Sequence, residues 1–75
     1  MFPMDAFSLN KIIADNVKNL RKQKGVSQEK AKDECGVNFS RIECALYSTN
    51  TVTITHLSNY FKIPPHHFLI ENSNN

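Results

Sequence analysis

The sequence has no tryptophan, only two cysteines and two glycines, and no long hydrophobic run. Two cysteines in 75 residues are too few for a disulfide framework, and the first residues lack the basic and apolar segments of a secretory signal. No apolar stretch approaches the roughly 18 to 20 residues that a membrane-spanning helix needs. We therefore expect a cytoplasmic protein with reduced thiols and no membrane partner.

Patterns that carry catalysis or cofactor chemistry are also missing. No Ser-His-Asp order, paired-carboxylate site or glycine-rich phosphate loop occurs, and one short domain leaves little room for a substrate cavity. The spacing of Cys35 and Cys44 fits no common zinc pattern, and adjacent His66 and His67 follow prolines. We expect Cys35 to act as a small hydrophobic residue. The sequence predicts no enzyme, cofactor, metal site or small-molecule substrate.

What the chain does have is an uneven distribution of charge. The formal net charge is +2, but seven basic residues stand against two acidic ones between Lys11 and Lys32, while residues 33–75 are net negative. Such an asymmetry is typical of a protein that binds a polyanion, although a solvated helix face has the same composition. Charge alone therefore leaves nucleic-acid binding and a plain solvated surface equally open.

A chain of this length makes one domain with a small core, and its apolar residues recur at helical spacing. The first expected helix runs from a Ser8 cap to Gly25, and the second from a Ser27 cap to Gly36. The third begins behind an Asn38 cap. The apolar residues that define these three helices are Leu9, Ile12, Ile13, Val17, Leu20, Ala31, Cys35, Phe39, Ile42, Ala45 and Leu46.

Two further helices are expected after a polar loop. Thr53 is expected to cap the fourth helix, and Pro65 to begin a short fifth one. The domain would then span residues 8–70, with an N-terminal arm at 1–7 and a disordered polar tail at 71–75. The sequence thus predicts an all-α fold, a compact bundle of about five short helices without a strand.

The segment CGVN, residues 35–38, joins the second expected helix to the third. A short turn containing glycine makes the following helix leave at a large angle, which is the geometry of a helix-turn-helix. In that arrangement the third helix projects its N-terminal end, and the second helix lies across a phosphate backbone. The turn therefore favours DNA binding over a plain solvated surface.

The residues on both sides of this turn resemble a known family. NLRKQKGVSQ, CGVNFSRI and TVTITHLSNYFKI are similar to the phage-repressor or Cro-like helix-turn-helix family, often called the XRE family, over roughly residues 9–70. NTVTI before THL also resembles the corresponding loop in controller proteins of restriction-modification systems. The resemblance implies a lambda-repressor-like DNA-binding domain. The residues that match the family pattern are Leu20, Arg21, Gly25, Ser27, Gln28, Gly36, Val37 and Ile42.

Two positions depart from the family pattern. Lys32 stands where the family usually has a small alanine at the crossing of two helices, so its ammonium must reach the surface or an acidic neighbour. In an ungapped comparison, Leu46 stands where the family usually has a glutamate. That glutamate pairs with the arginine that corresponds to Arg21. Sliding the comparison by three residues to use Glu43 would spoil the match at Ile42. We therefore expect Arg21 to face phosphate or to find another acid.

The resemblance also implies which side chains meet DNA. Phe39 and Ser40 are the expected base contacts, with Phe39 against a thymine methyl or a base step. Arg41 is expected to pair with guanine or to hold a phosphate, and Glu43 to accept from cytosine N4 or to serve an intramolecular pair. Cys44 completes the expected exposed face of the helix. The expected phosphate contacts are Arg21, Ser27, Gln28, Lys32, Asn38 and Asn50.

Together these patterns predict a sequence-specific DNA-binding transcriptional regulator, such as a repressor, that binds a palindromic operator as a homodimer. Ser27 and Gln28 would contact phosphate or, alternatively, simply cap their helix. The alternative function is a helix-turn-helix domain that binds a protein, as an antitoxin-like or anti-repressor module with little specific DNA binding. The residues expected to form the dimer surface, or else to close the core, are Tyr60, Phe61, Phe68, Leu69 and Ile70.

Overall fold

The structure, a computed structural model, describes residues 6–45 and 49–70, so the expected tail and most of the expected arm lie outside the described residues. Within these ranges the chain forms four α-helices, not five, together with one 3-10 helix and no strand. The expected all-α class is confirmed. None of these helices combines the length and apolar character that crossing a bilayer requires. The elements are α1 (Ala6–Lys24), α2 (Gln28–Cys35), α3 (Phe39–Glu43), α4 (Thr51–Phe61) and the 3-10 helix η1 (Pro65–Leu69).

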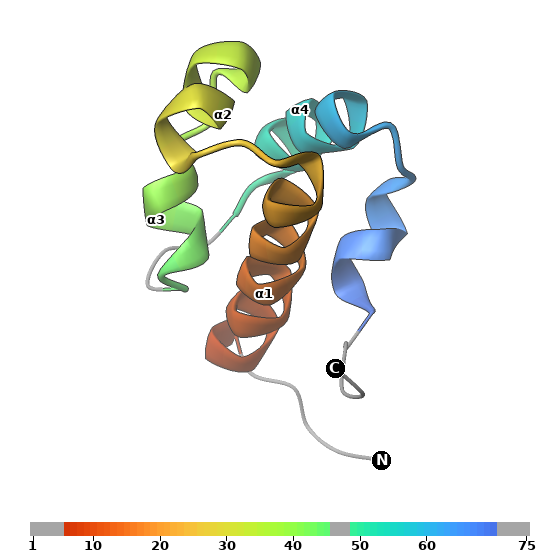
Figure 1. The fold of residues 1–75 in the computed structure, drawn as a ribbon. Helices are drawn as coiled ribbons and strands as arrows, with labels where there is room; N and C mark the ends of the chain where they lie inside the picture. The colour runs from red at the N-terminus through yellow and green to blue at the C-terminus, as the bar shows by residue number, and fades with distance from the viewer. Residues whose placement is uncertain (1–5, 46–48, 71–75) are drawn as a thin grey trace.

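Helix α1 is the axis on which the other elements pack. Figure 1 shows α2 and α3 on one side of α1 and η1 on the other, with α4 across one end. The largest fully buried side chains come one from each of four elements, Val17 of α1, Phe39 of α3, Leu57 of α4 and Phe68 of η1. The small side chain of Ala31 brings α2 into the same cluster. Each of the large side chains stabilises the fold by about 1.5 to 3 kcal/mol through burial.

The ends of α2 and the start of α3 follow the local chemistry expected from the sequence. Oγ of Ser27 accepts a hydrogen bond from the Lys30 amide at 3.0 Å, and Oδ1 of Asn38 accepts one from the Arg41 amide at 3.2 Å. Both expected caps are therefore confirmed. Gly36 ends α2 at φ 82°, the left-handed conformation that glycine adopts without the penalty of a Cβ atom.

Two expected helix starts are wrong. Helix α1 begins at Ala6, so Ser8 lies inside the helix and does not cap it, and the arm expected at 1–7 is partly helical. Helix α4 is capped by Asn50, whose Oδ1 accepts a hydrogen bond from the Thr53 amide at 2.8 Å. Thr53 therefore lies in the first turn, because the Asn50 side chain, three positions before it, satisfies its amide.

Helix α3 is shorter than its expected apolar positions imply. It ends at Glu43, Cys44 follows as the C-cap, and Ala45 takes a left-handed φ of 62°. A right-handed helix cannot continue through this conformation, which costs a residue with a Cβ atom about 1 to 2 kcal/mol. Ala45 is buried as expected, but it lies beyond the helix. The expected packing of Leu46 lies outside the described residues.

Asn16 fastens η1 to α1. Its side chain is buried, and its Nδ2 donates hydrogen bonds to the backbone oxygens of Phe68 at 2.7 Å and of Ile70 at 2.9 Å. Both amide hydrogens are used, so the buried donor carries no unpaired hydrogen. This contact holds the C-terminal segment beside the first helix and places Phe68 in the core.

The side chain of Tyr60 connects α4 to the other three α-helices. Its ring packs edge-on against Phe39 and Phe61, with centroid distances of 6.2 and 5.0 Å, and Nζ of Lys24 lies 4.9 Å from its centroid. Its hydroxyl donates a hydrogen bond to the carboxylate of Glu34. Removal from water, followed by the bond to this carboxylate, raises the pKa of Tyr60 to about 12.

We expect the free energy of unfolding to fall as the pH rises from about 10 to about 12. The folded protein holds the Tyr60 proton more tightly than the unfolded chain, where the pKa is about 10. The contribution is complete below the unfolded value and is lost as the pH rises through the folded value. Urea denaturation across this range measures the loss. The Tyr60→Phe variant has no proton to lose and should show a shallower slope; equal slopes would contradict the assignment.

Candidate nucleic-acid interface

Helices α2 and α3 are joined by a turn of two residues before the Asn38 cap. The amide of Gly36 donates to the backbone oxygen of Lys32 at 2.7 Å, which closes α2. Val37 then turns into the core with 6% of its surface exposed. Gly36 sets the change of direction, and Val37 anchors the turn in the core. Helix α3 then packs against both α2 and α1.

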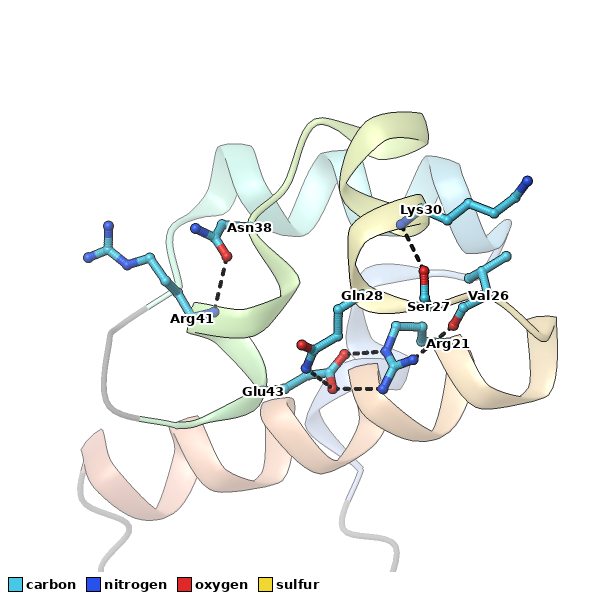
Figure 2. A network of polar contacts seen from close by, with 8 residues as sticks. All are labelled: Arg21, Val26, Ser27, Gln28, Lys30, Asn38, Arg41 and Glu43. Atoms are coloured by element: carbon cyan, nitrogen blue, oxygen red, sulfur yellow. Dashed lines mark hydrogen bonds and ion pairs between the residues drawn. The ribbon is translucent and has the colours of Figure 1, made fainter.

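A polar network inside the fold fixes α3 relative to α1 and α2 (Figure 2). Nε and Nη2 of Arg21 donate to the two carboxylate oxygens of Glu43 at 2.7 and 3.2 Å, and Nη1 donates to the backbone oxygen of Val26 at 2.8 Å. Nε2 of Gln28 donates to Oε1 of Glu43 at 3.0 Å. The two charged side chains are only 12% and 4% exposed. A bidentate pair in this setting is a strong positioning contact.

This network corrects the expected role of Arg21. The sequence comparison without gaps left Arg21 for phosphate and rejected its pairing with Glu43, yet that pairing is the one that forms. The hydrogen bond that Arg21 donates to Glu43 raises the pKa of the Arg21 guanidinium, so Arg21 stays protonated. The comparison failed because it allowed no gap: the acidic partner of Arg21 is Glu43, three residues before the position that it had assigned to this role.

Phe39 is also misplaced by the sequence analysis. It is fully buried, and its ring packs edge-on against Tyr60 and Phe61 at centroid distances of 6.2 and 6.1 Å. The expectation that it stands on the exposed face of α3 is wrong. Phe39 belongs to the same buried core cluster as Ala31 of α2. Phe39 therefore belongs to the core and not to the exposed face of α3.

The exposed side chains at α3 are those of Ser40, Arg41 and the C-cap residue Cys44. Arg41 lies away from the polar network in Figure 2, and Sγ of Cys44 donates to its backbone oxygen at 3.0 Å. Glu43, the one carboxylate of α3, is turned inward and paired, so it is not available to accept from cytosine. The exposed face of α3 consequently carries a cation and a hydroxyl but no carboxylate.

A hollow of about 310 Å³ adjoins this face, between the turn before α3 and the start of α4. Asn38 and Asn50 both line it, and their Oδ1 atoms are used as helix caps. Within the described residues, their Nδ2 groups remain as hydrogen-bond donors. Arg41 and His56 also line the hollow, and none of its lining residues is acidic. This arrangement suits a phosphate oxygen.

The sequence analysis did not include His56 in the site, and it placed the start of α4 three residues too late. A usable signal was present, because Asn50 stands three residues before Thr53, the spacing at which a cap side chain reaches a backbone amide. Recognising this cap would have placed the first turn of α4, and with it His56, beside the turn before α3.

The α2 residues expected at phosphate lie beside α3. Ser27 is exposed and takes the capping role, and Gln28 is exposed while its amide nitrogen binds Glu43. Lys32 is exposed and lines a second hollow together with Gln28, Glu29 and Ser40. Its ammonium is therefore not buried at the helix crossing, where Ala31 is the fully buried side chain.

The residues expected at a dimer surface divide into two groups. Phe68 is fully buried, and Tyr60 and Phe61 are partly buried against the core, so these three mainly close the fold. Phe68 thus takes the alternative role expected for it, closing the core, where the hydrogen bond from Asn16 holds its backbone against α1. The side chains of Leu69 and Ile70 remain exposed.

Comparison with protein-family models, curated proteins and solved structures finds no significant match for this chain.

Proposed function

We propose that this protein is a sequence-specific DNA-binding regulator that uses α2 and α3 as a helix-turn-helix. The observation that supports the proposal best is the composition of the α3 face, where Ser40 and Arg41 are exposed and the one carboxylate is paired inside. A polyanion approaching this face meets no opposing charge from α3 itself. The hydroxyl and guanidinium are groups that bind base edges and phosphates.

Two kinds of contact would follow from this geometry. Arg41 and Ser40 would meet base edges in the major groove, while the donors of Asn38 and Asn50 in the adjoining hollow would hold a phosphate. Lys32 lies exposed beside Ser40 and would add a further phosphate contact. The Arg21–Glu43 pair contacts no DNA in this arrangement; it holds α3 in place.

The proposal includes the homodimer, the palindromic operator and the cytoplasmic location expected from the sequence. One short helix reads about half of a site, and a two-fold axis doubles both the base contacts and the phosphate contacts. Whether the protein represses or activates a gene depends on where the operator lies relative to the promoter. Selection of binding sites from a random pool of duplexes would identify the operator, and a palindromic product is expected.

We expect Arg41→Ala to weaken operator binding by about 1 to 3 kcal/mol, because the exposed guanidinium would lose its contact with a base or phosphate. Lys18→Ala is a matched control, since it removes one exposed positive charge from α1. Binding is measured by fluorescence anisotropy at several salt concentrations, and affinity should fall steeply with added salt. Equal affinities for the two variants, or an affinity that does not change with salt, would rule the proposal out.

A second candidate function, binding to another protein, is favoured by the shortness of α3. Five residues, Phe39–Glu43, offer little more than one turn for a DNA groove. An antitoxin-like or anti-repressor module would need no longer helix, because protein partners can use surfaces outside α3. Absence of duplex binding even at low salt would favour this second function over the first.

A further inference from the structure

A mainly apolar groove of about 520 Å³ lies between the first half of α1, the start of α4 and η1. Its apolar walls come from all three elements and are Leu9, Ile13, Ile54, Pro65 and Leu69. A cavity of this volume with a largely apolar lining is typical of a site that binds a small molecule. Leu69 is 51% exposed, so a ligand in the groove would remove apolar surface of the folded protein from water.

The polar side chains of the lining belong to η1 and to the segment that begins α4. Oδ1 of Asn50 accepts a hydrogen bond from the Thr53 amide, so its Nδ2 group is the part that can bind a ligand, as a donor. The ring of His66 and the hydroxyl of Thr51 can each donate a hydrogen bond as well. This edge of the groove therefore suits a chemical group that accepts hydrogen bonds.

We propose that the groove binds a free medium-chain fatty acid, with the alkyl chain against the apolar walls and the carboxylate at Asn50 and His66. An ionised carboxylate only accepts hydrogen bonds, and its two oxygens can bind both donors. Its negative charge also complements a chain with a formal net charge of +2.

Both parts of the ligand are needed to match the lining. A plain hydrocarbon would leave the donors of Asn50 and His66 without an acceptor when it displaced water from them. A short carboxylate such as acetate would leave the apolar walls in contact with water. A fatty acid satisfies the polar edge and covers the apolar walls at the same time.

The proposed ligand site meets the proposed DNA interface at Asn50. Thr49 and Asn50 line both the groove and the hollow beside Arg41. Under the proposed function Nδ2 of Asn50 holds a DNA phosphate, so a carboxylate that accepts from the same group would compete with it. We expect the fatty acid and the operator to weaken each other's binding by the same factor. This coupling rests on the proposed function, whereas the binding of the fatty acid does not.

The test is isothermal titration calorimetry of the full chain with octanoate, below the concentration at which octanoate forms micelles. We expect one octanoate per chain with a dissociation constant of about 10 to 500 μM. Leu69→Glu places a carboxylate in the apolar wall and should weaken binding at least tenfold. Val52→Glu is the matched control, because it changes an exposed apolar residue of α4 that is not among the lining residues. It should change the affinity less than threefold.

A second variant tests the position of the carboxylate. Asn50→Ser keeps an oxygen that can cap α4 but removes the amide donor. It should weaken the binding of octanoate more than the binding of octanol, which has the same alkyl chain without the charge. Loss of a merely structural contact would affect both ligands equally. Far-ultraviolet circular dichroism checks that each variant keeps its helices.

The possible results separate this inference from the proposed function. Absence of saturable octanoate binding would overturn the inference, as would equal losses for Leu69→Glu and Val52→Glu, or octanol binding as tight as octanoate. Octanoate binding by a protein without affinity for any duplex would support the inference and defeat the proposed function. Duplex binding by a protein that binds no octanoate would do the reverse.

Discussion

Replacing Glu43 with alanine is expected to destabilise the fold by about 3 to 5 kcal/mol, the loss typical of removing one partner from a buried ion pair. The carboxylate is only 4% exposed and accepts hydrogen bonds from both Arg21 and Gln28. Its removal would leave the Arg21 guanidinium, itself 12% exposed, without its anion. Urea denaturation followed by circular dichroism measures this loss.

The Lys11–Asp15 pair provides the matched control, because it joins the same kinds of charge at 3.3 Å with both side chains more than half exposed. Asp15→Ala should cost no more than about 0.5 kcal/mol. Changing Arg21 to leucine together with Glu43→Ala should recover part of the loss, since no charge then remains buried. Similar small losses for Glu43→Ala and Asp15→Ala would show that Glu43 is not a structural anchor.

Phe39→Ala is expected to cost about 3 to 5 kcal/mol, because it removes a fully buried ring that contacts two other aromatic side chains. A domain this small has little stability in reserve, so much of the variant should be unfolded at room temperature. Thermal and urea denaturation would both detect the loss. The expected cavity lies in the core cluster to which Phe39 and Ala31 belong.

The conservative variant Phe39→Leu separates a core role from a base contact. It should lose less than about 2 kcal/mol of stability and keep its affinity for the selected operator, because a buried side chain touches no base. Ser40→Ala is the companion variant on the exposed side, expected to keep full stability. If Phe39→Leu kept its stability but lost sequence selectivity, the ring would have to reach DNA after all.

The features that sequence analysis predicted correctly are local ones. The caps at Ser27 and Asn38 and the left-handed Gly36 each depend on a hydrogen bond or a dihedral angle within four residues. Such features need only the order of neighbouring side chains. The all-α class follows in the same way from helical spacing of apolar residues.

The features that could not be predicted depend on contacts between distant segments. Arg21 and Glu43 are 22 positions apart, and their pairing depends on how α1 and α3 pack. Phe39 is buried against Tyr60 and Phe61, two side chains of another helix. Comparison with a family pattern assigned both roles by position alone. The expected exposure of Ser40 and Arg41 is confirmed, because their side chains point away from the Arg21–Glu43 pair and from the aromatic contacts of Phe39.

The length of α3 has a consequence for how much information the protein can read. The first turn of a recognition helix meets about three base pairs, so a dimer of such helices would specify about six. A given six-base-pair sequence occurs by chance roughly once in four thousand base pairs, which is far too often to single out one promoter. Under the proposed function, occupancy of the correct site would depend on additional features. Several operators side by side, or a stretch of DNA that bends easily between the half-sites, would supply what five residues cannot.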